Sequence, residues 1–214
     1  MKKIKKPKVL KKVISEQQQE KILEYLSTHQ QRNNAFDNAI GRKCADIKTT
    51  FIDGESIPFE VYEILNKIVA DNFSSTAVPS YFIWFQYSPR HGTPMLPPHL
   101  DDNACTYTID IQLKSNVSWS MYINGKEYLW EDGDALLYDG VNQLHWRPKF
   151  PGDKYSDYVE VFIAHYAEPD HWFFNKTGVN PLRTDEYHAA YKKREHKMIK
   201  KYLHKSMSTY QKYV

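Results

Sequence analysis

Cysteine and long apolar runs are both scarce in this 214-residue chain, and each shortage excludes a class of protein. Two cysteines, Cys44 and Cys105, are too few for a disulfide framework, so the sequence predicts two reduced thiols. No apolar run reaches the ~18 residues of a membrane span, so we expect no membrane partner. The first twelve residues are basic and lack the apolar stretch of a signal peptide, which predicts a cytoplasmic protein.

Charge is unevenly distributed, although the net charge is only +3. Residues 1–12 contain seven lysines and no acid, and residues 192–214 contain eight Lys or Arg and a single acid, Glu195. The chain between them holds 25 acidic and 14 basic residues. The basic ends are compatible with an anionic partner such as nucleic acid, or with solvated ends that dock on the acidic body. The second interpretation is favoured because no nucleic-acid-binding motif accompanies the lysines.

Hydrophobic periodicity divides the chain into a helical, a β and a second helical part. Ser15 and Gln18 have the spacing of a capping box, and apolar residues follow at helical spacing, so we expect a helix over about 16–28. A second helix is expected over about 58–72, where apolar residues again share one face. The stretch 33–48 between them is polar and is expected to be irregular, with a short strand after it.

From Tyr81 the period changes to two, as in β-strands. Aromatic residues, which favour strands, are plentiful, with 16 Tyr, 10 Phe and 5 Trp. Asn124-Gly125 between two apolar runs predicts a type I′ hairpin. Strands are expected within 81–88, 105–113, 117–123, 124–130, 131–140, 142–147 and 157–166. Short strands without intervening helices predict an α+β, mainly β fold, built as an antiparallel sandwich or barrel.

The length and the 41% hydrophobic content suffice for one domain with a sizeable core. We expect a basic N-terminal arm over 1–12 and a single domain over 13–183, with its barrel at about 81–166. A basic C-terminal helix is expected over 184–214, because Thr184 and the acids after it suit a helix start.

One short segment, PPHLD, carries the chemistry that sets this sequence apart. Pro97 and Pro98 exclude a helix, and in an extended chain His99 and Asp101 point to the same side, so both can reach one metal ion. The simpler interpretation is a turn that happens to contain a histidine. The metal interpretation needs a third ligand, and His145, after the run GDALLYDG, is the best candidate. Two histidines and one carboxylate form the facial triad of non-haem iron(II) oxygenases.

The segment 81–166 resembles the double-stranded β-helix, or cupin-like jelly roll, of iron(II)- and 2-oxoglutarate-dependent dioxygenases. The resemblance rests on HLD, on the hairpin GDALLYDG followed by His145, and on the strand order around them. It implies that the two leading helices buttress the barrel and that His99, Asp101 and His145 bind Fe(II). It also implies 2-oxoglutarate and O2 as cosubstrates and admits ascorbate as a further cofactor.

The family also uses a basic residue to hold the distal carboxylate of 2-oxoglutarate, usually about ten residues after the second histidine. The last predicted strand here contains neither Arg nor Lys, so the sequence departs from the pattern. Arg147 shares a strand face with His145 and is the favoured anchor, while Lys154 has the closer spacing but lies in a predicted turn. Tyr87 and Tyr138 are candidates to hydrogen-bond the same cosubstrate, although a core tyrosine is the favoured interpretation for either one alone.

The resemblance implies hydroxylation of a C–H bond in a protein side chain or a small polar molecule, with release of succinate and CO2. Compact members of the family include the prolyl hydroxylases. Two alternatives stay open at this stage: a cupin-like metalloenzyme that does not use 2-oxoglutarate, and a non-catalytic jelly-roll binding module. Neither the primary substrate nor the role of the basic ends follows from the sequence.

Overall fold

A computed structural model describes residues 6–28, 32–37, 43–52, 57–91, 94–175 and 184–203. The start of the expected N-terminal arm, residues 1–5, and the end of the expected C-terminal helix, residues 204–214, lie outside the described residues. Cys44 lies in a described strand whose side chains are not described, so only Cys105 is characterised as a free, buried thiol.

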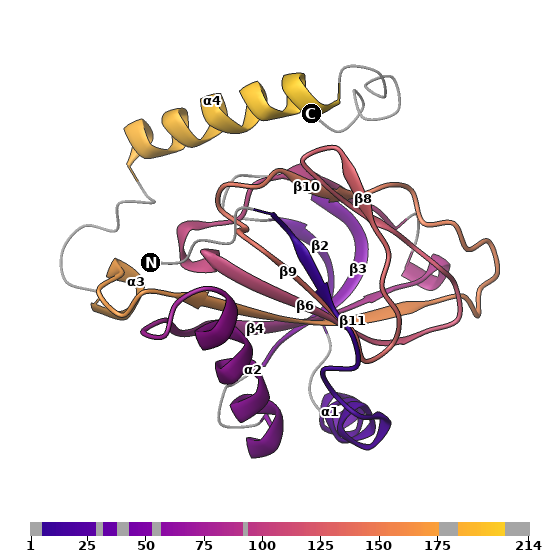
Figure 1. Cartoon of the computed structure of the whole chain (residues 1–214). Helices are drawn as coiled ribbons and strands as arrows, with labels where there is room; N and C mark the ends of the chain where they lie inside the picture. The colour runs from indigo at the N-terminus through magenta and orange to yellow at the C-terminus, as the bar shows by residue number, and fades with distance from the viewer. Residues whose placement is uncertain are drawn as a thin grey trace.

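The described strands form two antiparallel sheets (Figure 1). The large sheet has the spatial order β1 (Lys8–Leu10), β9 (Ala135–Tyr138), β6 (Tyr107–Ser115), β11 (Val159–Ala167), β4 (Val78–Tyr87), β3 (Lys43–Ile52) and β2 (Arg32–Asp37). The small sheet has the order β5 (Leu96–His99), β10 (His145–Arg147), β7 (Met121–Ile123) and β8 (Lys126–Tyr128). This arrangement confirms the predicted mainly β, antiparallel jelly roll.

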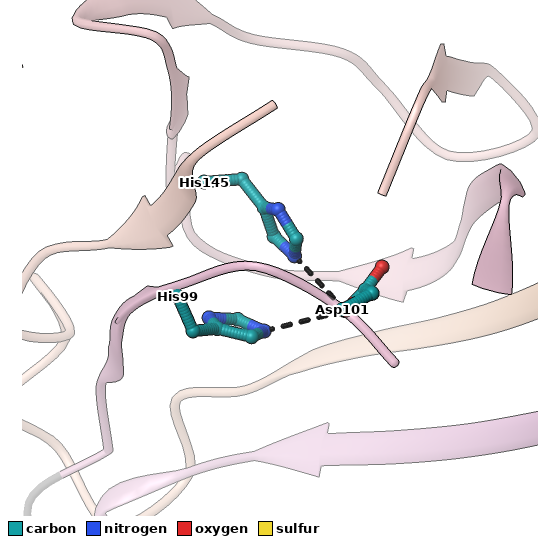
Figure 2. A group of neighbouring side chains, drawn as sticks. All are labelled: His99, Asp101 and His145. Atoms are coloured by element: carbon teal, nitrogen blue, oxygen red, sulfur yellow. Dashed lines mark ion pairs between the residues drawn. The ribbon is translucent and has the colours of Figure 1, made fainter. Parts of the chain in front are cut away.

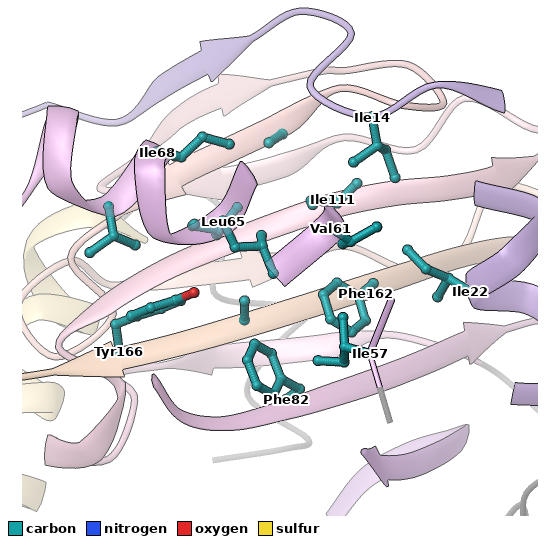
Figure 3. Close-up of a cluster of buried hydrophobic side chains, with 14 of the residues drawn as sticks. Ile14, Ile22, Ile57, Val61, Leu65, Ile68, Phe82, Ile111, Phe162 and Tyr166 are labelled. Atoms are coloured by element: carbon teal, nitrogen blue, oxygen red, sulfur yellow. The ribbon is translucent and has the colours of Figure 1, made fainter. Parts of the chain in front are cut away.

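Helices α1 (Glu16–Thr28) and α2 (Phe59–Asn72) cover one face of the large sheet (Figure 1). Their buried side chains, including Ile22 and Leu65, pack against strand residues such as Phe82 and Phe162 (Figure 3). The other face of the same strands points into the barrel interior. Because each strand alternates its side chains between these two faces, most of its residues are buried.

Local signals in the sequence are found in the structure where they were expected. The Ser15 N–H donates to Gln18 Oε1 at 2.8 Å and the Gln18 N–H donates to Ser15 Oγ at 3.3 Å, which is the reciprocal pattern of a capping box. Asn124 and Gly125 have φ of 50° and 80°, as a type I′ turn requires.

Two expectations for the first half of the chain are corrected. The stretch 33–48 is not irregular, since β2 and β3 occupy most of it and β3 pairs with β4. Backbone pairing with the apolar strand β4 stabilises β3, although the polar side chains of this stretch do not indicate a strand. Strand β1, within the basic arm, was also not foreseen, and it pairs with β9 at the other end of the large sheet.

The chain after the barrel forms a short helix α3 (Trp172–Asn175) and then the long helix α4 (Asp185–Tyr202). Thr184 caps α4, because its hydroxyl accepts a hydrogen bond from the Tyr187 N–H at 3.2 Å. Helix α4 lies on the side of the molecule opposite α1 and α2, along the small sheet (Figure 1). In the described part of the chain, every helix is too short or too polar to cross a membrane.

Candidate metal centre

His99 and His145 face each other from neighbouring strands of the small sheet. His99 ends β5, His145 begins β10, and the two residues are directly paired in the antiparallel register. Their ring centroids lie 4.2 Å apart. Residues 144 and 146 therefore point to the opposite face of the strand, as does residue 100 of the HLD segment.

Asp101 completes a three-residue group with these two histidines (Figure 2). Its Oδ1 lies 3.5 Å from His99 Nε2 and 3.3 Å from His145 Nε2. One ligand atom from each of the three residues lies within 4.8 Å of the other two. The sequence spacing led us to expect this convergence, and the donor set of two imidazoles and one carboxylate suits ferrous iron.

Backbone contacts fix which nitrogen each histidine presents. His99 Nδ1 lies 2.8 Å from the Pro97 carbonyl oxygen, and His145 Nδ1 lies 2.9 Å from the Gln143 carbonyl oxygen. A carbonyl only accepts, so each Nδ1 donates its proton to the carbonyl, and Nε2 is the nitrogen that each ring turns toward Asp101. Metal-binding histidines in proteins are commonly oriented by this kind of hydrogen bond.

The three groups perturb one another strongly. Burial alone would raise the pKa of Asp101, but the His145 and His99 imidazoles beside it hold that pKa well below its usual value. Burial opposes protonation of His145, and the Asp101 carboxylate outweighs this effect and raises the His145 pKa. The site therefore keeps a carboxylate anion in a buried place, which is the charge state that a divalent cation needs.

Gly140 makes room for the Asp101 carboxylate. The Asp101 N–H donates to the Gly140 carbonyl at 2.9 Å. A side chain at position 140 would collide with Asp101 Oδ2, and its Cβ would lie 2.8 Å from both the Cys105 carbonyl oxygen and Thr108 Oγ1. The turn that ends β9 thus forms a cradle that only glycine leaves open.

A second group of polar side chains lies behind Asp101. The Thr108 hydroxyl lies 3.4 Å from Asp101 Oδ2 and 3.2 Å from His165 Nδ1. Cys105 Sγ lies 2.5 Å from the Tyr81 hydroxyl. Burial lowers the pKa of His165 to about 4, so this imidazole is neutral. Asp101, Cys105 and His165 also lie close enough to one another to hold a cation. This second group includes Asp101 of the first group, and its other two side chains already contact hydroxyl groups: Cys105 that of Tyr81, and His165 that of Thr108.

Arg147 lies inside the barrel, two residues after His145 on the same strand face. Its side chain is 1% exposed and is surrounded by the rings of Tyr87, Trp119 and Trp130, at 4.6–5.7 Å from the guanidinium carbon. Nη1 donates to the Trp119 carbonyl at 3.0 Å. Nη2 is buried without a hydrogen-bond partner in the described structure, as is the nearby Trp130 Nε1.

Asp110 is a functional candidate that the sequence reasoning missed. Its carboxylate lies 3.7 Å from Arg147 Nη2, and its second oxygen is buried without a hydrogen-bond partner in the part of the chain described. Burial raises the pKa of Asp110 to about 6, against the opposing effects of Arg147 and His145, while Asp101 adds to the rise. The alternation of Thr108, Asp110 and Gln112 on one face of β6 was the available signal.

The remaining predicted site residues divide into buried and exposed ones. Tyr138 is buried with its ring centroid 4.8 Å from that of His145, and burial together with Asp101 and Asp110 raises its pKa well above the usual value. Tyr87 is also buried and flanks Arg147. Lys154 is exposed in the turn after β10, where its N–H donates to Asp157 Oδ2 at 2.9 Å. Of the two predicted anchors, only Arg147 therefore lies in the barrel.

Nη2 of Arg147, which faces Asp110 at 3.7 Å but has no hydrogen-bond partner in the described structure, is the observation that tests whether 2-oxoglutarate fits. A buried guanidinium nitrogen without a hydrogen bond is costly unless a ligand supplies one, and a carboxylate matches the planar guanidinium group. The residues present therefore fit a dicarboxylate whose far end meets Arg147. Asp110 already lies against this guanidinium, so the fit requires that its negative charge be removed or tolerated.

The chain is similar to known proteins in structure but not in sequence. The chain matches no protein-family model, and no curated protein matches it in sequence. Solved structures of low sequence identity do match. HygX from Streptomyces hygroscopicus, with nickel and 2-oxoglutarate bound, is 10% identical with a TM-score of 0.56, over 77% of this chain and 83% of that one.

Two prolyl hydroxylases match to a similar degree. The enzyme from Trichoplax adhaerens, in complex with a hypoxia inducible factor peptide, is 12% identical with a TM-score of 0.55, over 81% of this chain and 87% of that one. The prolyl-4-hydroxylase from Pseudomonas putida is 10% identical with a TM-score of 0.55, over 75% and 92%. The chain therefore has the double-stranded β-helix fold of the iron(II)- and 2-oxoglutarate-dependent oxygenases.

Proposed function

We propose that this protein is an Fe(II)- and 2-oxoglutarate-dependent dioxygenase that hydroxylates a C–H bond. The observation that carries the proposal is the group of His99, Asp101 and His145 inside a barrel whose interior also holds Arg147 Nη2, buried without a hydrogen-bond partner in the described structure. The first three residues would hold the iron and Arg147 would hold the far carboxylate of 2-oxoglutarate. Iron and 2-oxoglutarate, when bound, supply the oxidation, in which O2 delivers one oxygen atom to the substrate and one to succinate while CO2 is released.

The protein's own residues bind and orient rather than transfer protons. The His99 and His145 rings are fixed by the carbonyls of Pro97 and Gln143, and the Asp101 carboxylate is fixed by the Gly140 cradle. The aromatic rings around Arg147 exclude water from the guanidinium, which strengthens its attraction for a carboxylate. Tyr138, whose raised pKa keeps its hydroxyl protonated, can donate a hydrogen bond into the same interior.

We infer that the substrate is a protein side chain or a small polar molecule. Support comes from structures of the same fold, one of which holds a hypoxia inducible factor peptide and another hygromycin B. In the described residues, the exposed lysines of α4 are the one feature that favours a nucleic-acid partner. The cytoplasmic location stays a prediction.

The experiment that tests this function is an anaerobic titration of the protein with Fe(II) and then with 2-oxoglutarate. We expect one iron per chain and a weak visible charge-transfer band that appears only when both are present. With O2 and ascorbate, succinate should then form slowly even without a primary substrate. Iron binding without any response to 2-oxoglutarate would instead indicate a metalloenzyme that does not use it, and the absence of stoichiometric metal would indicate a binding module.

A further inference from the structure

Helix α4 is seated on the residues that neighbour the three proposed ligands in the sequence. Leu100 lies between His99 and Asp101, and Leu144 and Trp146 flank His145. These three side chains form one buried cluster with Tyr191 and Ile199 of α4 and with Leu203, the residue that follows the helix. Since side chains alternate along extended segments, the ligands point to one side, where they form their own group, and their neighbours point to α4 on the other.

Two side chains of α4 also bind the backbone of Leu100 directly. Glu195 Oε2 accepts a hydrogen bond from the Leu100 N–H at 3.0 Å, and the Tyr191 hydroxyl donates to the Leu100 carbonyl oxygen. The first bond involves the peptide unit that joins His99 to Leu100, and the second involves the unit that joins Leu100 to Asp101. Helix α4 therefore fixes both peptide planes between the two ligands.

A third contact joins α4 to the turn that lies against Asp101. Arg194 Nη2 donates to the Val141 carbonyl oxygen at 2.9 Å, and the preceding residue, Gly140, accepts from the Asp101 N–H. Helix α4 thus binds the HLD segment and the turn that cradles its carboxylate. Neither segment is close to α4 in the sequence.

The identity of Glu195 argues that these contacts serve more than packing. It is the only acid in residues 192–214, and its side chain is buried at 2% exposure on a helix whose open face carries lysines. Burying a carboxylate is unfavourable unless it is well hydrogen-bonded, so an apolar residue would dock the helix at lower cost. A charged acceptor gives a strong, directional bond to one N–H, which is the property that a positioning residue needs.

We propose that α4 is a positioning element of the metal centre, in which Glu195 and Tyr191 hold the Leu100 backbone so that His99 and Asp101 aim at one ion. The inference rests on the proposed metal centre, because the contacts of α4 can position ligands only if His99 and Asp101 bind a metal ion. It implies reciprocal coupling: α4 raises the metal affinity, and a bound metal ion stabilises the docking of α4 by the same free energy.

The test uses cobalt(II) as the metal probe and needs no cosubstrate. Cobalt(II) affinity is measured by calorimetry and its coordination by visible absorption, for the wild type and for Glu195→Ala, Glu195→Gln and Tyr191→Phe. We expect Glu195→Ala and Tyr191→Phe to weaken binding by about 10–100-fold, with a changed spectrum. Glu195→Gln keeps an oxygen acceptor for the Leu100 N–H and should recover most of the affinity. Lys193→Ala, on the exposed face of the same helix, is the matched control and should leave binding unchanged.

The outcomes separate the two proposals. If the wild type binds no cobalt(II), the metal centre itself fails. If the wild type binds cobalt(II) and Tyr191→Phe, which removes a single oxygen atom, binds it with the same affinity and spectrum, the positioning role of α4 is overturned. Hydrogen exchange gives an independent measurement: amides of α4 should exchange more slowly with cobalt(II) bound, and equal rates would count against the coupling even if Glu195→Ala does not fold.

Discussion

Arg147 and Asp110 form a buried pair in the barrel interior, with Nη2 of the guanidinium 3.7 Å from the carboxylate. The pair leaves one Asp110 oxygen and Arg147 Nη2 without hydrogen-bond partners in the described structure. A ligand carboxylate that approaches Arg147 must therefore share the guanidinium with Asp110. If Arg147 holds 2-oxoglutarate as proposed, this relationship predicts that the binding depends on the protonation of Asp110.

The first prediction concerns that pH dependence. The pKa of Asp110 is about 6, so the carboxylate is charged and repels a second carboxylate at higher pH, and becomes neutral as the pH falls through 6. The affinity of the iron-loaded protein for 2-oxoglutarate should rise as the pH falls toward 6. Asp110→Asn should bind 2-oxoglutarate roughly tenfold more tightly at neutral pH and lose most of this dependence. Anaerobic titrations at several pH values measure both effects, and parallel curves for the two proteins would contradict the prediction.

The second prediction separates the two roles of Arg147. Arg147→Gln should abolish measurable binding of 2-oxoglutarate while iron still binds. It should also lower the free energy of unfolding by about 3–5 kcal/mol, because Asp110 is left as an unpaired buried charge. In Arg147→Gln/Asp110→Asn the stability should largely recover while the binding does not. Chemical denaturation measures the stability of these variants, and titration of the same samples measures their binding of 2-oxoglutarate. If the double variant still binds 2-oxoglutarate, Arg147 is not its anchor. Lys154→Gln is the control that should bind normally.

The third prediction distinguishes the two clusters that share Asp101. His99→Ala and His145→Ala should each abolish stoichiometric cobalt(II) binding, since each removes a proposed ligand. His165→Asn should keep one cobalt(II) per chain and cost only stability, because it loses a hydrogen bond to Thr108. The reverse result, with metal lost in His165→Asn and kept in His99→Ala, would place the ion in the cluster behind Asp101.

The fourth prediction uses two glycines. Gly140→Ala places a methyl group against Asp101 Oδ2, so the carboxylate must move and metal affinity should fall by at least about tenfold. Gly133→Ala, away from the ligands and from α4, has a φ of 82° and would place its Cβ 2.8 Å from the Ile14 carbonyl oxygen, so it should cost at least about 1 kcal/mol of stability and leave metal affinity intact. Equal metal affinity in both variants would show that the Gly140 cradle does not position the ligand.

The jelly roll could be predicted because its strands alternate and its turns carry strong local signals. Asn124-Gly125 and the Ser15 capping box depend only on neighbouring residues, and both are confirmed. Strand β2 and the first part of β3 could not be recognised, because their side chains are polar and carry no strand pattern, whereas the end of β3 was expected as a short strand after residue 48. Their formation depends on the edge that β4 offers, which is a property of the folded sheet rather than of the segment.

The candidate site shows the same division. The convergence of His99, Asp101 and His145 could be predicted from the sequence, because prolines fix an extended HLD segment and a hairpin returns the second histidine to it. Their role as iron ligands stays a prediction. Asp110 was visible in the alternation of β6 but had no partner to suggest a role until Arg147 was placed beside it. The contact of Glu195 with Leu100 could not be predicted, because no local pattern relates two residues that lie 95 positions apart.

Strand β1 has a consequence for how this protein is handled. It covers one edge of β9, and it is tied there by Lys11 and by the Lys12 N–H, which bind the buried Asp134 carboxylate at 2.7 Å and 2.9 Å. A deletion of the lysine-rich beginning of the chain would therefore uncover a row of unpaired amides and carbonyls on an apolar strand. Such an edge recruits further strands from other molecules, so the shortened chain should self-associate more strongly than the chain that keeps β1.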